Sequence, residues 1–504
     1  MMPIPELPAP TQIPLPQNTM KPRLFATPIL AAALLSFIPG PRVAAQVSNT
    51  FELTSSGNAN WNDAANWTRT EGSDSVPQTV ADKAIVSGNS GDSRNLVVNA
   101  NGIHLGEMEY SSTGTSTQRL EADSGSSRLL KIGTLTKNGA YVLSIRNNAG
   151  TLAVEIGDFV HNTNEVVIGQ ASSLEQFTVT GTSTIGANGI FLLAGVQGGI
   201  IQLGNLDLAG SLVLGGRGYS SGTVSVASLK GSGDIQVSSS SNHNGTAGTL
   251  LIESTNATPT TFSGILRDYQ SSLRPAVLTV RKAGAGTQIL SRSAGNTYTG
   301  TTTIEGGVLA VTNTSGSGLG TGAVVVEAGG ALAGSGLIAP GAGNGITVRN
   351  GGVVAPSAHL ATGFAALTLD GTATGSEPLL TLNEGAAFTF RFGAGDASDR
   401  IEFTGYEAGK LALFAGGIAV NGLEVLEGTF TLLSFNTIST SEIAELGGLL
   451  TIGSGFGGYN ATFSWEENAI LLNVAAIPEP GLAGLLLLGA GALGVARLRR
   501  KALC

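Results

Sequence analysis

Cysteine and charge are both scarce in this chain of 504 residues, whose one cysteine is Cys504. A disulfide within the chain, a cysteine-based metal site and an iron–sulfur cluster are therefore excluded. Charged residues make up only 12% of the chain, the net charge is −9, and Lys and Arg do not cluster between the two ends. The electrostatic footprint of a nucleic-acid-binding protein is missing, so we expect no nucleic-acid partner.

Histidine is scarce as well. His104, His161, His243 and His359 are far apart in the sequence, and none belongs to an HExxH motif or to another paired spacing typical of metal ligands. The sequence therefore predicts neither a metal site nor a cofactor.

Glycine and small β-forming residues are abundant, whereas charged residues are few. The chain has 73 glycines and is 42% hydrophobic, whereas a disordered chain would be more charged and less apolar. Glycine and threonine are poor helix formers, so the composition favours many short strands joined by tight turns. We expect an all-β fold.

Three segments repeat one pattern of strand, Gly-Gly turn and strand: TTTIEGGVLAV, AVVVEAGGALAG and GITVRNGGVVAP. Their second glycines are Gly307, Gly330 and Gly352, separated by 330 − 307 = 23 and 352 − 330 = 22 residues. A regular period of this length indicates a solenoid, in which each repeat forms one coil and stacking buries the apolar side. Alternation places Val324 and Val326 inside. The prediction is a right-handed parallel β-helix, with the handedness taken from the rule for parallel crossovers.

The N-terminal region has the order of a secretory signal peptide. Lys21 and Arg23 precede the apolar run LFATPILAAALLSFI, and small residues lead to a predicted cleavage between Ala45 and Gln46. The proline-rich residues before Met20 fit no part of such a signal, so we expect translation to start at Met20. The chain would then be exported by the Sec machinery.

The C-terminal region has a second three-part pattern. Residues 481–496 are apolar, they follow two prolines, and arginines come directly after them. Sixteen residues are at the short limit for a membrane-spanning helix. The basic cluster would stay in the cytoplasm, so we expect a transmembrane helix that anchors the chain transiently in the inner membrane.

This tail resembles the PEP-CTERM sorting signal. The matching residues are Pro478, Glu479, Pro480, Arg497, Arg499 and Arg500. The resemblance implies recognition by an exosortase, a membrane-embedded protease that removes the tail. It also implies export to the cell surface or the extracellular space of bacteria that make extracellular polysaccharide.

The middle of the chain resembles the autotransporter-associated beta strand repeat. The similarity runs from Thr261 to Ser357 and includes Gly284-Ala285-Gly286-Thr287 and Asn296-Thr297-Tyr298-Thr299-Gly300. The segment NWNDAANWTRTEGSDSVPQTVADKAIV resembles the N-terminal start common in such proteins. The resemblance implies an exported β-helical passenger.

The sequence divides into five predicted segments. These are an N-terminal extension with the signal peptide (1–45), irregular coils with an N-terminal cap (46–260), the repeat (261–357), a C-terminal β-rich region (358–475) and the sorting signal (476–504). In the fourth segment, RIEFTG, FTLLSF and AILLNV are expected strands.

Two glycine motifs match catalytic or nucleotide-binding patterns but lack the required context. GYSSG, at 218–222, matches a nucleophile elbow, yet a strand-like stretch follows it where a helix is needed. GSGFGG, at 453–458, matches a dinucleotide fingerprint, yet it too precedes a strand-like stretch. A solenoid turn explains the first better, and the second is expected by chance in a chain this rich in glycine.

Carboxylates are the remaining candidates for chemistry. Asp396 and Asp399 lie in a glycine-rich turn that could hold calcium or act on a polysaccharide, although a solvated turn is the favoured interpretation. Glu305 and Glu327 occur at corresponding turns, with Arg349 near the third such place, which favours surface charge balance over an acidic pair.

Trp61 and Trp67 are open to two interpretations. They could be stacking platforms for sugars, or they could form a hydrophobic cluster that covers the exposed first coil of the solenoid. The second is favoured.

Together these observations predict a non-enzymatic, exported structural or adhesive β-solenoid, sorted through its tail to the cell surface or the polysaccharide matrix. Outward Thr, Ser and Asn side chains would bind extracellular polysaccharide through many weak contacts. The alternative is a β-helix enzyme that degrades polysaccharide as a lyase or hydrolase.

Overall fold

The computed structural model describes residues 49–477, apart from 55–56, 73, 88–93, 112–115, 126, 148–149, 170–173, 194–199, 216–221, 238–246 and 270–275. The predicted signal peptide, its cleavage site at Ala45 and Gln46, and the predicted sorting residues from Pro478 to Arg500 lie outside the described residues. Within the described part, no helix has the length and apolar character needed to cross a bilayer.

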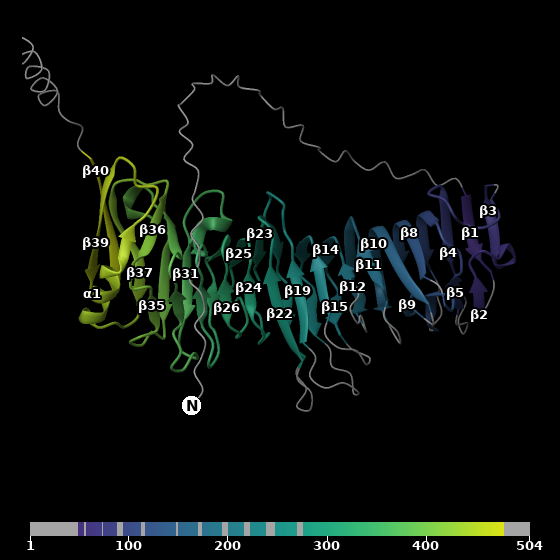
Figure 1. Ribbon diagram of the computed structural model, residues 1–504, viewed down its shortest axis with the longest axis horizontal. Helices are drawn as coiled ribbons and strands as arrows, with labels where there is room; N and C mark the ends of the chain where they lie inside the picture. The colour runs from purple at the N-terminus through teal and green to yellow at the C-terminus, as the bar shows by residue number, and fades with distance from the viewer. Residues whose placement is uncertain are drawn as a thin grey trace, which may run out of the picture. The chain divides into compact units, whose positions relative to one another are not determined.

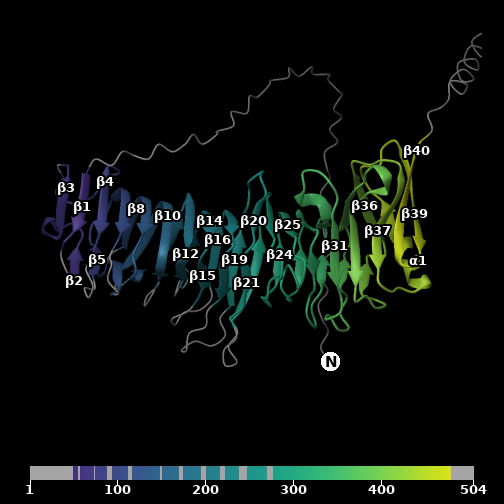
Figure 2. The same cartoon turned by 180° about the vertical axis from the view of Figure 1, so that it is seen from behind.

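The described residues form a parallel β-solenoid. They contain one sheet of 34 strands and a second of six, and nearly all neighbouring strands pair in parallel with a partner one coil further along the chain. Three ladders of paired strands, here called A, B and C, run along the stack. Figure 1 shows the strands side by side from β1 to β40, and Figure 2 shows the same stacking from behind. The prediction of an all-β parallel solenoid is therefore confirmed.

Ladder A runs from the first coil to the last. Its strands are β1 (Asn49–Leu53), β4 (Asp82–Val86), β6 (Ile103–Tyr110), β8 (Ser127–Lys137), β10 (Thr151–Ile168), β12 (Thr182–Leu193), β14 (Asn205–Leu208), β17 (Ser228–Gly231), β20 (Thr260–Phe262), β23 (Thr287–Leu290), β25 (Gly307–Val311), β27 (Gly330–Gly334), β30 (Val353–Val354), β33 (Ala387–Arg391), β36 (Ile418–Leu423) and β38 (Leu450–Ile452).

Ladder B begins with the first halves of the long strands β6, β8 and β10. It continues through β11 (Gln176–Val179), β13 (Ile200–Gln202), β16 (Thr223–Val226), β19 (Ala247–Ile252), β22 (Val277–Lys282), β24 (Thr302–Ile304), β26 (Val324–Val326), β29 (Ile346–Val348), β32 (Leu380–Leu382) and β35 (Leu411–Leu413).

Ladder C has two parts. The first contains the ends of β10 and β12 and, in addition, β2 (Gly57–Asn60), β5 (Arg94–Val98), β7 (Gln118–Ala122), β9 (Leu143–Arg146), β15 (Ser211–Leu214), β18 (Asp234–Val237) and β21 (Ile265–Arg267). The second is the six-stranded sheet of β28 (Leu337–Ile338), β31 (Ala366–Asp370), β34 (Arg400–Thr404), β37 (Gly428–Phe435), β39 (Tyr459–Glu466) and β40 (Ala469–Ala476). The expected strands RIEFTG, FTLLSF and AILLNV coincide with β34, β37 and β40.

Each glycine repeat of the sequence forms one coil of the solenoid. Gly307 pairs with Gly330 across β25 and β27. On ladder B, Thr302 pairs with Val324 and Val324 with Ile346, so each coil takes 324 − 302 = 22 and 346 − 324 = 22 residues. The next two coils are longer: Ile346 pairs with Leu380 and Leu380 with Leu411, which gives 380 − 346 = 34 and 411 − 380 = 31 residues. These longer coils carry the extra loops that build the cleft described below.

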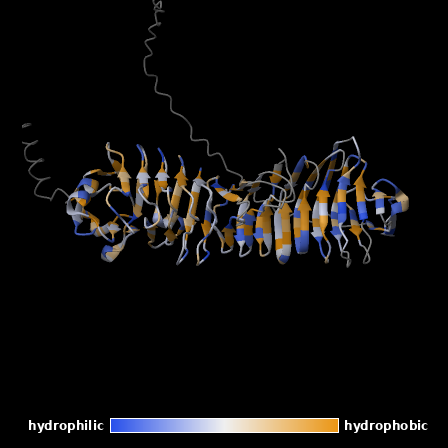
Figure 3. Ribbon diagram, turned by 90° about the horizontal axis from the view of Figure 1, so that it is seen from below, coloured by the Kyte–Doolittle hydropathy of each residue, from blue (hydrophilic) through white to orange (hydrophobic). Residues whose placement is uncertain are grey.

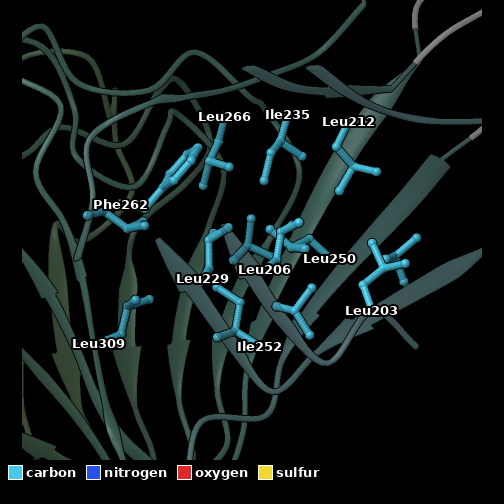
Figure 4. Close-up of a cluster of buried hydrophobic side chains, with 14 of the residues drawn as sticks. Leu203, Leu206, Leu212, Leu229, Ile235, Leu250, Ile252, Phe262, Leu266 and Leu309 are labelled. Atoms are coloured by element: carbon cyan, nitrogen blue, oxygen red, sulfur yellow. The ribbon is translucent and has the colours of Figure 1, made fainter. Parts of the chain in front are cut away.

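Aliphatic side chains fill the interior. Alternate residues of each strand point inward, and Figure 3 shows apolar and polar bands alternating along the strands. Leu206 of ladder A pairs with Leu229, and Leu212 of ladder C pairs with Ile235, so aliphatic side chains of successive coils lie directly above one another. Figure 4 shows these side chains meeting Leu250 and other residues of ladder B in the centre. One coil cannot bury its apolar side alone, so stacking is the source of stability.

Both ends of the stack interrupt the parallel pattern. At the first coil, β3 (Trp67–Glu71) pairs antiparallel with β1, after the short 3-10 helix η1 (Ala64–Asn66). At the last coil, β40 pairs antiparallel with both β37 and β39. Helix α1 (Thr440–Gly448) is capped at its N-terminus by Ser439, whose side chain accepts a hydrogen bond from Glu442 N. Such caps protect the open strand edges of a solenoid.

Candidate functional site

The two tryptophans of the first coil are buried in the N-terminal cap. Trp61 is 0% and Trp67 7% exposed, and their ring centroids are 5.4 Å apart. Trp61 Nε1 donates to Pro77 O at 2.8 Å, and Trp67 Nε1 donates to Trp61 O at 2.8 Å. Neither ring presents a face on which a sugar could stack, so the geometry favours the covering cluster.

The glutamates of the repeat turns are bound to arginines of neighbouring coils. Arg281 binds Glu305, and Arg349 Nη1 lies 2.7 Å from Glu327 Oε1. The hydrogen bond to Glu305 raises the pKa of the Arg281 guanidinium. This arrangement is one of charge balance and leaves neither carboxylate poised for acid–base chemistry.

The described histidines do not converge on a metal site. His161 is buried against Phe159, and burial together with Lys137 lowers its pKa to about 4. His359 is buried in the short helix η2 (Pro356–His359), with Nδ1 3.0 Å from Pro356 O. His243 lies outside the described residues. No group of three or more His, Cys, Asp or Glu side chains able to hold a metal exists in the described part of the chain.

The two glycine motifs provide no catalytic context. Most of GYSSG lies outside the described residues. GSGFGG connects β38 to β39, so no helix begins there to receive a phosphate.

Asp396 and Asp399, the predicted carboxylate pair, have different surroundings. Asp399 is 1% exposed and accepts three hydrogen bonds, from Ser357 Oγ at 2.6 Å, Ala365 N at 2.8 Å and Arg391 N at 2.9 Å. Burial raises the pKa of its carboxyl, although these bonds oppose the shift. Asp399 therefore joins strand β33 to helix η2 and to Ala365, at the end of the loop that follows η2.

Asp396 is exposed and lies at the end of the 3-10 helix η3 (Ala394–Asp396). Its backbone is left-handed, with φ 61°, which is uncommon for a residue other than glycine. Its Oδ1 accepts a hydrogen bond from Thr429 N at 3.0 Å, which ties the turn to strand β37. The two aspartates therefore hold different contacts, and only Asp396 faces solvent.

Asp396 borders an open cleft of about 500 Å³ on the outer face of the second sheet. Strands β34 and β37, at the yellow-green end of Figure 1, form its floor. Its lining consists of Phe364, Asp396, Ala397, Ser398, Arg400, Thr429, Thr431 and Ser434. The size is in the range of small-molecule sites, and one aromatic ring, one carboxylate, one guanidinium and several hydroxyls converge there.

The charges of the cleft are partly neutralised. Arg400 Nε lies 2.6 Å from Glu402 Oε1 of the same strand. Among the lining residues Asp396 is the one carboxylate, whereas glycoside hydrolysis ordinarily uses two. The arrangement is suited to holding a polar, hydroxyl-rich ligand.

Sequence reasoning singled out Asp396 but missed Phe364, Arg400, Thr429 and Ser434. The lining comes from three stretches in three successive coils, and no regular period relates them. The available signal was the change in coil length after Ile346, where insertions interrupt the 22-residue period of the coils just before it.

The residues that carry the repeat pattern have structural roles. Asn296 Oδ1 accepts from Leu266 N at 2.9 Å, and Asn296 Nδ2 donates to Gly318 O at 2.7 Å, so one side chain links three coils. Tyr298 is buried, with its hydroxyl 2.7 Å from Thr302 Oγ1. Thr299 N donates to Asp268 Oδ2 at 2.9 Å. Asn296 to Thr299 follow strand β23 of ladder A and precede strand β24 of ladder B, at the place in the coil where ladder C, among the described residues, has no strand between β21 and β28.

Comparison with known proteins finds one family. Residues 280–311 match the model of the passenger-associated transport repeat. No curated protein and no solved structure matches the chain significantly. The match lies inside the predicted repeat and confirms it for this segment, whereas the resemblance of the tail to a PEP-CTERM signal stays a prediction. The repeat and the parallel β-solenoid together indicate an exported, autotransporter-like passenger domain.

Proposed function

We propose that this chain is a non-enzymatic adhesive or structural protein that binds extracellular polysaccharide at the cell surface or in the surrounding matrix. The observation that carries the proposal is a row of outward positions on ladder B, paired in register over successive coils. The row is Gln202, Ser225, Leu251, Arg281, Thr303, Val325, Thr347 and Thr381.

Most members of this row are hydrogen-bonding side chains, and neighbouring strands in a sheet are about 4.8 Å apart. A polymer lying along the row meets a donor or acceptor at nearly every coil. Each contact is weak, but linked contacts act at high effective concentration, so their combined affinity exceeds that of any one. Leu251 and Val325 interrupt the row and supply apolar contact instead.

The test is retention of the mature protein on extracellular polysaccharide purified from its own host. Replacing Thr347 and Thr381 by valine removes two hydroxyls of the row and keeps the side-chain shape, so retention should fall. The matched control is Thr184→Val, an outward threonine of ladder A. Absence of retention by the unaltered protein would contradict the proposal. Release of reducing ends or unsaturated products, lost in Asp396→Asn, would instead support the polysaccharide-degrading alternative.

The proposed route to the surface uses both predicted end signals. The Sec machinery exports the chain, cleavage occurs between Ala45 and Gln46, and the tail holds the protein in the inner membrane. An exosortase then removes the tail by recognising Pro478, Glu479 and Pro480. Mass spectrometry of the protein from cells with and without an exosortase tests this route, and an unchanged tail in both would refute it.

A further inference from the structure

We infer that the cleft lined by Phe364, Asp396, Arg400 and Ser434 binds one neutral pyranose unit of the polysaccharide. The inference rests on the proposed glycan-binding function and gives it a discrete recognition site. The row on ladder B supplies repeated weak contacts, whereas the cleft selects the sugar.

The aromatic wall of the cleft is exposed and yet fixed in position. Phe364 is 40% exposed. A Cβ atom on Gly393 would lie 2.3 Å from Phe364 Cζ, so the ring packs directly on a residue without a side chain. An apolar ring held open to solvent can stack on the C–H face of a pyranose, as aromatic side chains do on other apolar faces.

Buried residues beneath the cleft hold the loop that carries Phe364 in place. Asp399 binds Ser357 Oγ in the preceding helix η2 and Ala365 N at the end of the loop, and Arg391 Nη1 donates to Gly363 O at 2.8 Å. These buried groups are positioning residues, since they hold the wall without lining the cleft. A wall ordered before binding lowers the entropic cost of capturing a ligand.

The polar groups match the hydroxyls of a sugar. Asp396 uses Oδ1 to bind Thr429 N, and a carboxylate can accept further hydrogen bonds through both oxygens. Arg400 contacts Glu402 through Nε, and a guanidinium has four more N–H donors on its terminal nitrogens. Thr431 and Ser434 add hydroxyls from the floor. The left-handed backbone at Asp396 is the kind of strain that structures retain at binding sites.

The charges favour a neutral sugar over an acidic one. Asp396, Arg400 and Glu402 together carry a net charge of −1. A uronic acid placed here would add a negative charge beside Asp396, and like charges disfavour one another.

The test measures affinity of the full mature chain for dextran, laminarin, galactomannan and alginate by affinity electrophoresis. At least one neutral polymer should be retained, and Phe364→Ala should weaken that retention about tenfold, the effect of losing one stacking contact. The matched control is Phe414→Ala, because Phe414 is also exposed, at 37%, packs on Gly416 and lies outside the cleft. Ser434→Ile fills the floor without touching the wall and should weaken retention as well.

The outcomes separate the two proposals. Retention of a neutral polymer that is equal in the unaltered protein, Phe364→Ala and Ser434→Ile would overturn the cleft and leave the proposed function standing. Retention of alginate alone, lost in either variant, would overturn the neutral class. No retention of any polymer, including the host's own, would overturn both. Thermal melting of each variant verifies that it is folded.

Discussion

Arg281 holds Glu305 of the next coil through two charge-assisted contacts, Nε to Oε1 at 2.6 Å and Nη2 to Oε2 at 3.0 Å. One coil further on, Glu327 binds Arg349 in the following turn. Glu305 therefore binds an arginine of the preceding coil, whereas Glu327 binds an arginine of the following coil. The order arginine, glutamate, glutamate, arginine neutralises each carboxylate and ties the coils together in pairs.

Breaking the first pair should cost little. Both side chains are substantially exposed, and exposed ion pairs contribute about 0.2–1 kcal/mol. We expect Glu305→Gln to lower the free energy of unfolding by less than about 1 kcal/mol. A double-mutant cycle with Arg281→Met in urea denaturation measures the coupling, and Glu327→Gln is the matched control. A loss several times larger would show that this pair is more than surface charge balance.

Asn296 should matter far more, because its side-chain amide is buried and joins three coils. Asn296→Ala would leave Leu266 N and Gly318 O without these partners. Each buried group left unsatisfied costs about 1–3 kcal/mol, so we expect a loss of about 2–6 kcal/mol. Urea denaturation gives the value. The control is Asn344→Ala, which removes a similar bond, from Asn344 Nδ2 to Thr321 O, at an exposed site. Equal losses in the two variants would contradict the bridging role.

Gly300 is predicted to tolerate no side chain. A Cβ atom there would lie 2.2 Å from Leu278 O of the preceding coil, a backbone atom that cannot move aside. Overpacking of this kind costs about 1–3 kcal/mol or more, so Gly300→Ala should lower the melting temperature clearly. Gly457→Ala is the control, because no atom lies within 4 Å of its Cβ position. Similar melting temperatures for both variants would refute the close approach.

The repeat could be read from the sequence because its causes are local. Gly300 is followed one coil later by Gly322, because each coil must pass the preceding one closely, and a Cβ atom on Gly322 would lie 2.0 Å from Gly300 O. The cleft could not be read in this way. Phe364 and Ser434 are 70 residues apart (434 − 364 = 70), and insertions of irregular length separate them. Asp396 and Asp399 looked equivalent by spacing, but the pleat and the turn send one carboxylate outward and the other into the core.

The buried ring of His161 should make stability depend on pH. It pairs in register with Lys137, stacks on Phe159 and has a pKa lowered to about 4, mainly by burial, against 6.5 for a free imidazole. Between these two values the unfolded chain binds a proton that the folded chain does not, so stability falls as pH drops from 6.5 toward 4. The full effect of a shift of this size is about 3 kcal/mol.

The variant that isolates this effect is His161→Phe, which keeps a ring against Phe159 and has no group to protonate. Urea midpoints at pH 7 and at pH 4.5 should differ less for this variant than for the unaltered protein, because carboxylates contribute equally to both. His104→Gln replaces an exposed histidine and should leave the pH dependence unchanged. If the unaltered protein and His161→Phe lost the same stability on acidification, the folded protein would have to hold the imidazole in its ordinary, solvated state. That outcome would contradict the burial of the His161 ring beside Phe159 and Lys137 inside the solenoid.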